Sequence, residues 1–186
     1  MKQTCPARWS GIVLGIALLT TQPALGRDQP SHVPPCEGAQ HHQFDFWIGN
    51  WQVTNPAGKV VGHNRVERIE NGCGIQENWR STTGVTGRSI NAWSRQDGRW
   101  HQTWLGSGGM LLQLAGGLRD GSMVLEGKTA GADGKNVRQR ISWTPQANGR
   151  VRQHWQQSRD GGESWTTVFD GLYTRSAQAK TEHAGN

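Results

Sequence analysis

The sequence has few of the features that would identify a membrane, nucleic-acid-binding or nucleotide-binding protein. Its main apolar run, Gly11 to Leu19, is shorter than the roughly 20 residues that a membrane-spanning helix requires. The net charge is +6, but the basic residues are scattered without a run of about five or six, which favours a solvated surface over a nucleic-acid partner. No G-x-S-x-G, Walker or dinucleotide-binding motif occurs, so no motif of these kinds assigns an activity.

Residues 1–26 have the pattern of a cleavable secretory signal peptide. Lys2 and Arg8 form a positive region, the apolar run follows, and Pro23 to Gly26 place small residues before a cleavage point. The residue directly after Gly26 is Arg27 and not a cysteine, which argues against a lipoprotein anchor. An uncleaved membrane anchor is the alternative interpretation. We therefore expect a periplasmic or secreted protein.

Cysteine is scarce, because the chain contains only three. Cys5 lies in the expected signal peptide and would be removed with it. Cys36 and Cys73 remain as an even pair in an oxidising compartment, which favours a disulfide over two free thiols. A metal site would need further ligands, and neither cysteine belongs to a C-x-x-C pair. The Cys36–Cys73 bond would tie the segment before the domain to the turn between the second and third strands.

Polar flanks and turn dipeptides divide the rest of the chain. Residues 27–43 begin with the Pro-rich run RDQPSHVPP and predict an extended lead-in. Residues 44–175 predict one β domain, and the polar residues 176–186 predict a disordered tail. No internal repeat occurs, which argues against a propeller. Hairpin dipeptides that tolerate a positive φ are Asn71-Gly72, Asp97-Gly98, Asp120-Gly121, Asp133-Gly134, Asn148-Gly149 and Asp160-Gly161.

The segments between these turns are short and alternate in polarity, as β-strands do. Their regular spacing predicts an all-β fold, a single closed antiparallel up-and-down barrel of about ten strands. Phe44 to Ile48 is the one segment expected to form a short helical turn, just before the first strand. The predicted strands are 49–54, 59–70, 74–80, 87–95, 99–105, 110–117, 123–129, 136–144, 150–158 and 165–174.

Alternation also places the side chains on two faces. In the fifth predicted strand, Gln102 lies between Trp100 and Trp104 on one side, and three other strands have a similar arrangement. A barrel of about ten strands can enclose one small ligand among such residues. The predicted ligand-binding residues are Trp51, Glu77, Trp79, Gln102, Gln139, Gln153 and Trp155.

Three functional hypotheses follow from this interior. The leading one is a non-enzymatic protein that binds a small amphipathic or aromatic molecule, with tryptophans giving apolar contact and the amides and Glu77 fixing its orientation. The second is a hydrolase-type enzyme in which burial raises the pKa of Glu77 and makes it a general acid or base. The third is a structural or chaperone-like envelope protein with a filled core.

His41-His42 and Asp45 are the group that most suggests a metal site. Adjacent histidines ahead of a domain are typical of flexible surface, and further ligands are not evident. We therefore expect no metal and no cofactor.

Three stretches resemble a family of exported bacterial proteins of unknown function with lipocalin-like barrels. FDFWIGNW contains Gly49-x-Trp51, which resembles the opening motif of lipocalins and their calycin relatives. The other two stretches are NGCGIQENW and RDGGESWTTVFDGLY. The resemblance covers nearly all of residues 40–175. It implies the barrel and brings no established activity or catalytic residues.

Ten-stranded calycins also include nitrobindin-like haem proteins, in which a barrel histidine binds the iron. His63, His101 and His154 are the histidines within the predicted strands. Alternation places His101 and His154 on the face opposite the tryptophans, which argues against either as an interior haem ligand.

Ser158, Asp160, Gly162 and Trp165 match the Asp-box spacing of sialidase propellers. In that motif an aspartate bonds the backbone of a hairpin turn and a tryptophan packs beneath it, without a catalytic role. One copy in a chain of this length does not build a propeller, so we expect it to form the turn of the last hairpin.

Overall fold

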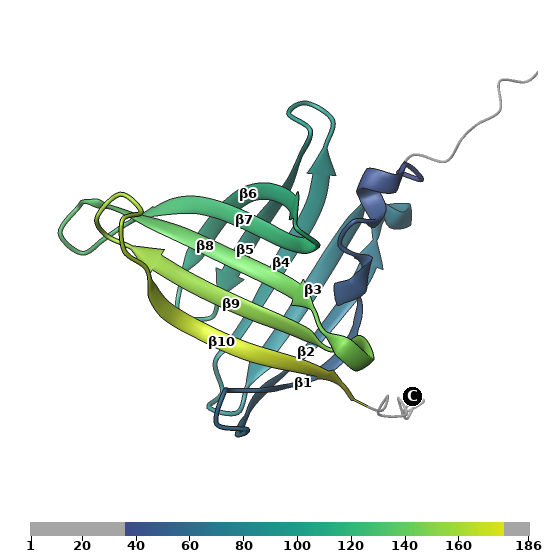
Figure 1. The fold of residues 1–186 in the computed structure, drawn as a ribbon, viewed down its shortest axis with the longest axis horizontal. Coiled ribbons are helices and arrows are strands. Elements are labelled where there is room, and N and C mark those ends of the chain that lie inside the picture. Colours follow the sequence, from purple (N-terminus) through teal and green to yellow (C-terminus); the bar gives the residue numbers. More distant parts are fainter. Residues whose placement is uncertain (1–35, 177–186) are drawn as a thin grey trace, which may run out of the picture. The chain divides into compact units, whose positions relative to one another are not determined.

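Ten antiparallel strands form a closed barrel in the computed structural model, which describes residues 36–176 (Figure 1). Each strand pairs with the next along the chain, and β10 pairs with β1 to close the ring. The predicted all-β, up-and-down barrel is therefore confirmed. The strands are β1 (Gly49–Thr54), β2 (Val60–Ile69), β3 (Gly74–Ser81), β4 (Thr86–Ser94), β5 (Arg99–Gly106), β6 (Leu111–Arg119), β7 (Ser122–Ala130), β8 (Asn136–Pro145), β9 (Val151–Ser158) and β10 (Thr166–Arg175).

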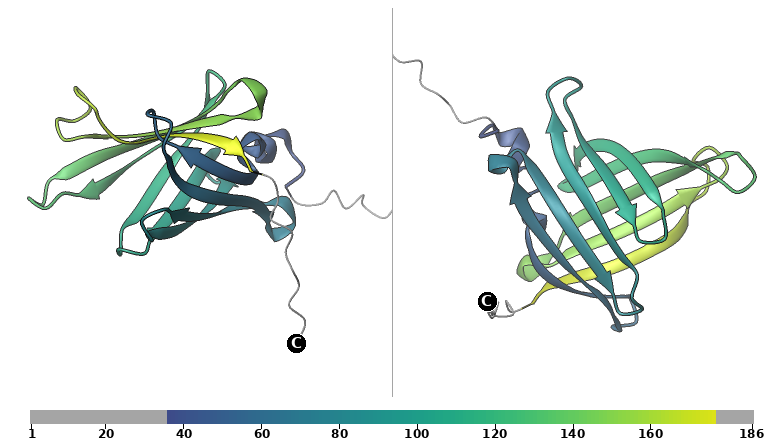
Figure 2. Two further views of the ribbon diagram at one scale, coloured as in Figure 1. Left: turned by 90° about the horizontal axis from the view of Figure 1, so that it is seen from below. Right: turned by 180° about the vertical axis from the view of Figure 1, so that it is seen from behind.

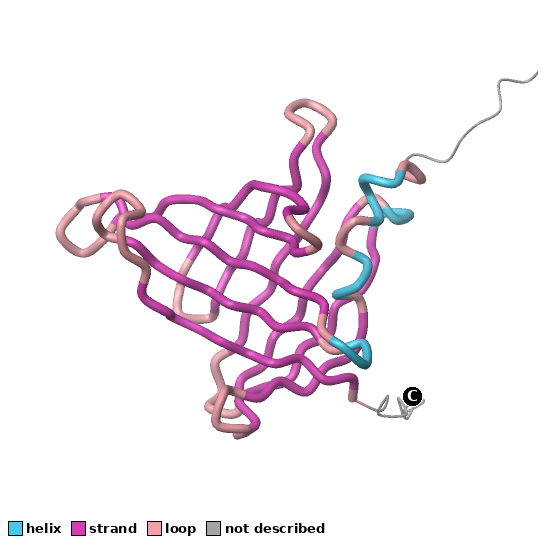
Figure 3. The backbone as a smooth tube through the Cα atoms, in the orientation of Figure 1, coloured by secondary structure: helices cyan, strands magenta, loops and turns pink. Residues whose placement is uncertain are grey.

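Four short 3-10 helices are the other regular elements of the described chain. They are η1 (Ala39–His42), η2 (Asp45–Trp47), η3 (Glu70–Gly72) and η4 (Ala147–Gly149). Figure 3 shows them in cyan, gathered on one side of the barrel. No helix within residues 36–176 is long and apolar enough to cross a membrane.

The segment before β1 differs in part from its expected extended form. Residues 39–42 of the predicted lead-in are helical, as η1, whereas the helical turn expected in 44–48 is present as η2. A 3-10 helix has three residues per turn, so Phe44 and Trp47 fall on one side, and both are fully buried. Predictions for the signal peptide 1–26, for 27–35 and for the tail beyond Ser176 concern residues outside the described range.

The two ends of the barrel are built differently. We call the end that carries η1 to η4 the closed end, and the end that carries the turns 55–59, 82–85, 107–110, 131–135 and 159–165 the open end. Figure 2 shows the segment before β1, in dark blue, at the closed end from two further directions. Glycines with positive φ, such as Gly84 and Gly109, make the tight turns of the open end possible.

Aromatic side chains fill the closed end. The ring of Phe44 stacks on Trp47 with centroids 4.9 Å apart and meets Trp100 and Trp143 edge-on at 5.7 and 5.1 Å. All four residues are at most 1% exposed. The segment before β1 therefore works as a plug whose two aromatic residues complete the core.

A disulfide holds the start of this plug. Cys36 is bonded to Cys73, with their Cα atoms 5.0 Å apart, so the predicted pairing is confirmed. Cys73 follows η3 at the closed end, where the chain turns from β2 into β3. The bond thus fixes the plug to the rim on which it lies.

Candidate functional site: a ligand cavity

The half of the barrel nearer the open end contains a cavity of about 200 Å³. Alternation along each strand brings one face inward: on β5, Trp100 and Gln102 are buried while His101 and Thr103 are exposed. Because the strands turn only at their ends, the inward residues form a continuous wall. The cavity is lined by Glu77, Trp79, Gln102, Trp104, Leu112, Ile141, Gln153, Trp155, Val168, Phe169 and Tyr173.

Glycines in the wall explain why this half of the barrel stays open. A Cβ placed on Gly62 would lie 2.4 Å from the ring of Trp79, and one on Gly87 would lie 2.1 Å from the ring of Trp104. Both distances are far below van der Waals contact, so the two rings occupy space that a side chain would otherwise take. Phe169 lies against Gly171 in the same way, at 2.6 Å. These rings therefore lie against the wall and leave the lumen free.

Glu77 is the acidic group of the cavity floor. Its side chain is 3% exposed; Oε1 accepts a hydrogen bond from Asn64 Nδ2 at 2.7 Å, and Oε2 accepts one from Ser89 Oγ at 2.8 Å. Burial raises the pKa of Glu77 from an ordinary value of 4.5 to about 7, against the effect of the hydrogen bonds from Ser89 and Asn64. The carboxyl group can therefore hold or release a proton near neutral pH.

Amide side chains extend the polar floor toward β5. Asn91 Nδ2 donates to Ser89 Oγ at 2.9 Å and to the carbonyl oxygen of Ile75 at 3.1 Å. Gln102 Nε2 donates to Asn91 Oδ1 at 2.8 Å. This series of hydrogen bonds fixes the position of Ser89. Because Ser89 bonds Glu77, it also fixes the orientation of the carboxyl group of Glu77.

Tyr173 extends the floor on the other side. Its hydroxyl group donates to Gln153 Oε1 and accepts a longer hydrogen bond, 3.4 Å, from Asn64 Nδ2. Burial and the nearby charge of Glu77 raise the pKa of Tyr173 well above its usual value. The hydroxyl therefore remains a donor, and it is already committed to Gln153.

The structure brings five of the seven predicted ligand-binding residues to this cavity, namely Glu77, Trp79, Gln102, Gln153 and Trp155. Gln139 instead lines an adjoining groove of about 600 Å³ at the open rim, together with Trp155. There Gln139 Oε1 accepts from Trp155 Nε1 at 2.8 Å, and Gln139 Nε2 donates to Thr129 Oγ1 at 2.8 Å. We call this space the rim groove.

Trp51 is the predicted binding residue that lines neither the cavity nor the rim groove. It is 1% exposed, its Nε1 donates to the carbonyl oxygen of Trp47 at 2.9 Å, and Arg175 lies over its ring at 4.6 Å. The alternating pattern correctly predicted that Trp51 points inward. The pattern could not show that this part of β1 lies beside the plug, at the closed end.

Several cavity residues were not among the predicted ones. Trp104 shares its face with Gln102, and Tyr173 is the only tyrosine of the chain, so both had a visible signal. Asn64 and Ser89, which bond Glu77 without lining the cavity themselves, had none, because short polar residues in a strand are typical of a solvated face. Phe169 follows a register shift between Thr167 and Phe169, and such an irregularity interrupts the alternation from which faces are assigned.

The histidines of the strands lie outside the cavity. His63 and His101 are exposed, His101 contacts Asp97 at 2.8 Å, and His154 contacts Thr167 at 2.9 Å on the outer face. No histidine among residues 36–176 lines the cavity. The placement of His101 and His154 opposite the tryptophans, as alternation predicted, is confirmed.

The histidine pair ahead of the barrel differs from the expected flexible surface. His42 is exposed and contacts Asp45 at 2.9 Å, but His41 is 3% exposed and meets the ring of Trp93 edge-on at 5.1 Å. Burial, followed by the charge of Arg95, lowers the pKa of His41. Within the described part of the chain, no cluster of three or more histidine, cysteine or acidic side chains is arranged to hold a metal.

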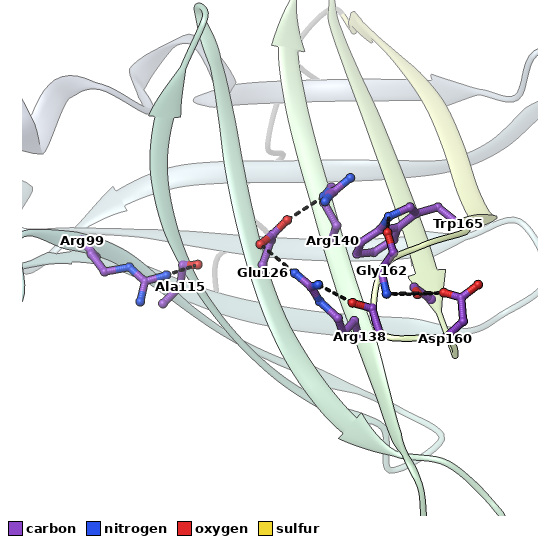
Figure 4. A network of polar contacts seen from close by, with 10 residues as sticks. Arg99, Ala115, Glu126, Arg138, Arg140, Asp160, Gly162 and Trp165 are labelled. Carbon is purple, nitrogen blue, oxygen red and sulfur yellow. Dashed lines mark hydrogen bonds and ion pairs between the residues drawn. The ribbon is translucent and has the colours of Figure 1, made fainter.

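The Asp-box residues form the predicted hairpin turn between β9 and β10 (Figure 4). Asp160 accepts hydrogen bonds from Ser164 and Gly162, and the bonds from Ser164 hold its pKa well below the usual range. The guanidinium group of Arg140 lies 3.9 Å from the ring centre of Trp165. The cluster is on the outer wall and stabilises the turn.

The sequence matches no family model, and no curated protein matches it.

Proposed function

We propose that this chain is an exported binding protein that holds one small amphipathic or aromatic molecule in the cavity. The observation that carries the proposal is the combination of an open space of about 200 Å³, aromatic walls and a hydrogen-bonded polar floor. For comparison, an engineered cavity of about 150 Å³ in another protein accommodates benzene. A ligand with one ring and a few further atoms matches the available volume.

The site is preformed, which supports binding over a space that opens by chance. Trp79 and Trp104 are held against glycines, and the floor groups are held by one another. Fixed groups lose little conformational entropy when a ligand enters, so more of the contact energy remains as affinity.

The proposal includes export of the protein and its resemblance to exported proteins with lipocalin-like barrels. The Cys36–Cys73 disulfide suits an oxidising compartment, and the sequence pattern of residues 1–26 suits a signal peptide. The closed ten-stranded barrel supports the resemblance to exported lipocalin-like proteins.

An enzyme that uses Glu77 is the second candidate, because a buried carboxyl group with a pKa of about 7 suits a general acid or base. Glycoside hydrolysis of the usual kind needs a second carboxyl group at a defined distance. Glu77 is the only carboxylate among the described residues that line the cavity. Binding without turnover therefore fits the site better.

The test compares two neighbouring leucines of β6 that face opposite ways. Leu112 lines the cavity, whereas Leu111 is 54% exposed and lines the rim groove without reaching the cavity. The Leu112→Phe variant fills part of the cavity, and Leu111→Phe adds the same atoms outside. Binding of a panel of one-ring compounds is followed by native mass spectrometry and tryptophan fluorescence.

We expect Leu112→Phe to weaken binding by about tenfold or more, equivalent to about 1.4 kcal/mol, and Leu111→Phe to leave it unchanged. Equal affinities in both variants, or no binding of any compound by the unmodified protein, would overturn the proposal. Turnover of an ester or glycoside that disappears in Glu77→Gln would favour the enzyme instead.

A further inference from the structure

The charge inside the cavity is of one sign. Glu77 is the only acidic or basic side chain that lines it within residues 36–176, although the whole chain carries a net charge of +6. Of the basic side chains near this half of the barrel, Arg80 and Arg88 are exposed on the outer wall, and Lys128 and Arg159 line the adjoining rim groove outside the cavity. When Glu77 is ionised, the potential in the cavity is negative, and the apolar walls reduce its screening.

The cavity floor has acceptors that lack donors. A carboxylate offers about four acceptor positions, and the carboxylate of Glu77 receives hydrogen bonds from Asn64 and Ser89. A buried carboxylate with free acceptor positions is costly, so a ligand that supplies N–H groups to Glu77 would be favoured.

The walls above the floor are built from aromatic rings. Trp79, Trp104, Trp155 and Phe169 all line the cavity, and Trp79 meets Phe169 at 82° with ring centroids 5.9 Å apart, so these two form a corner. The face of such a ring carries negative electrostatic potential and attracts a cation within about 6 Å. Aromatic walls around a carboxylate are a suitable environment for an alkylated ammonium group.

From these observations we propose that the ligand of the cavity is a small organic cation, an ammonium group carried on an apolar body of about one ring. The proposal rests on the binding function above and specifies its ligand class. The ammonium group lies next to Glu77 and the apolar body lies among the tryptophans. An anion would face the like charge of Glu77, and the hydroxyl donor of Tyr173 is already used by Gln153.

Proton binding to Glu77 competes with the cation. Protonation removes the negative charge, so affinity for the cation rises as the pH rises through about 7. Tyr173 is the other titratable group of the floor, and its raised pKa keeps it neutral over this range. A neutral ligand of the same shape should show no comparable dependence.

The experiment uses three probes that share one ring, namely benzylamine, benzyl alcohol and benzoate, measured by calorimetry at about pH 6 and about pH 8. We expect benzylamine to bind at least about tenfold more tightly than the other two at the higher pH, and to weaken at the lower pH. Glu77→Gln should remove the preference, so that this variant binds benzylamine no more tightly than benzyl alcohol.

Glu126→Gln is the matched control, because Glu126 is on β7 and pairs with Arg140 at 2.6 Å on the outer wall (Figure 4). It removes the same charge and should leave benzylamine binding unaltered. If Glu77→Gln does not fold, the pH dependence of the unmodified protein still decides the question.

Two outcomes would separate this inference from the binding function. The cation proposal is overturned if benzyl alcohol or benzoate binds as tightly as benzylamine, or if only neutral members of the wider panel bind. Either result leaves the proposed binding function standing. Failure of the whole panel to bind overturns both.

Discussion

The two ends of the barrel are both rich in aromatic residues, yet one is packed and the other is hollow. At the closed end Phe44 and Trp47 enter from outside the sheet, stack on each other and pack against Trp143. At the open end the rings of Trp79 and Trp104 lie against glycines of the wall. The comparison teaches that the number of large side chains does not decide whether a barrel is filled. What decides it is whether the rings meet one another or meet a glycine.

The indole N–H groups also differ, although those of Trp51 and Trp100 at the closed end are hydrogen-bonded. The indole N–H groups of Trp47 and Trp143 are buried without a partner among residues 36–176, whereas the N–H group of Trp155 donates to Gln139 at 2.8 Å. The closed end therefore gains its stability from packing, despite the cost of unpaired donors. The cavity end joins Glu77, Ser89, Asn91 and Gln102 in one hydrogen-bond network, and Asn64 Oδ1 is the buried acceptor there that has no partner among the described residues.

The largest expected effect is the loss of stability when a tryptophan ring is removed, and it should be greater at the closed end than at the cavity. Trp143→Ala removes a fully buried ring from the closed end and should lower the free energy of unfolding by about 3–5 kcal/mol. Trp155→Ala removes a half-buried ring from the cavity wall and should cost about 1–2 kcal/mol. Urea unfolding followed by circular dichroism measures both. Equal losses would contradict the difference between the ends.

Removal of the disulfide should give the second-largest loss of stability. The bond closes a loop between residues 37 positions apart, for which chain entropy gives at most about 4 kcal/mol. We expect replacement of both cysteines by serine to lower the free energy of unfolding by about 2–4 kcal/mol and to loosen the plug first. Hydrogen exchange should show η1 and η2 losing protection before the strands around the cavity. Uniform loss across the barrel would show that the plug and cavity are not separate units.

Glu77 should make the free energy of unfolding depend on pH. Because its pKa is about 7 in the folded state and 4.5 ordinarily, the folded chain binds more protons between these values. Its contribution to stability is therefore present below about pH 4.5, is lost as the pH rises toward about 7, and amounts to about 3 kcal/mol.

The measurement is the difference between unmodified protein and Glu77→Gln in urea unfolding from about pH 5 to about pH 8. The difference is needed because His41, whose pKa is lowered, contributes with the opposite sign and loses stability as the pH falls. Both proteins retain His41. We expect Glu77→Gln to gain relative stability with rising pH, and parallel curves would contradict this.

The smallest expected effect tests the glycines. Gly87→Ala places a Cβ 2.1 Å from the ring of Trp104, so the ring must move into the lumen, and ligand affinity should fall by about tenfold. Gly117→Ala on β6 is the control, since nothing lies within 4 Å of the added atom. Calorimetry with the tightest probe compares them. Unchanged affinity in Gly87→Ala would mean that the glycines do not create the cavity.

The sequence by itself determined the barrel. Turn dipeptides such as Asp97-Gly98 and alternation between them predicted ten strands whose ends agree with the structure to within one or two residues, as in 74–80 against β3. These signals are local, because a tight turn needs particular residues and a strand shows its two faces every second residue. The cysteine pair could be predicted because only two candidates remained outside the expected signal peptide.

Only the tertiary structure decided what lies at each level of the barrel. Alternation turned both Trp51 and Trp79 inward, but strand tilt and register place one at the plug and the other at the cavity. The same holds for His41, which the plug buries, and for Gly62, which receives the ring of Trp79 from a neighbouring strand. A period of two residues defines a face and carries no information about height along the barrel axis. Height depends on how ten strands are staggered against one another, and that stagger is settled only when the ring closes.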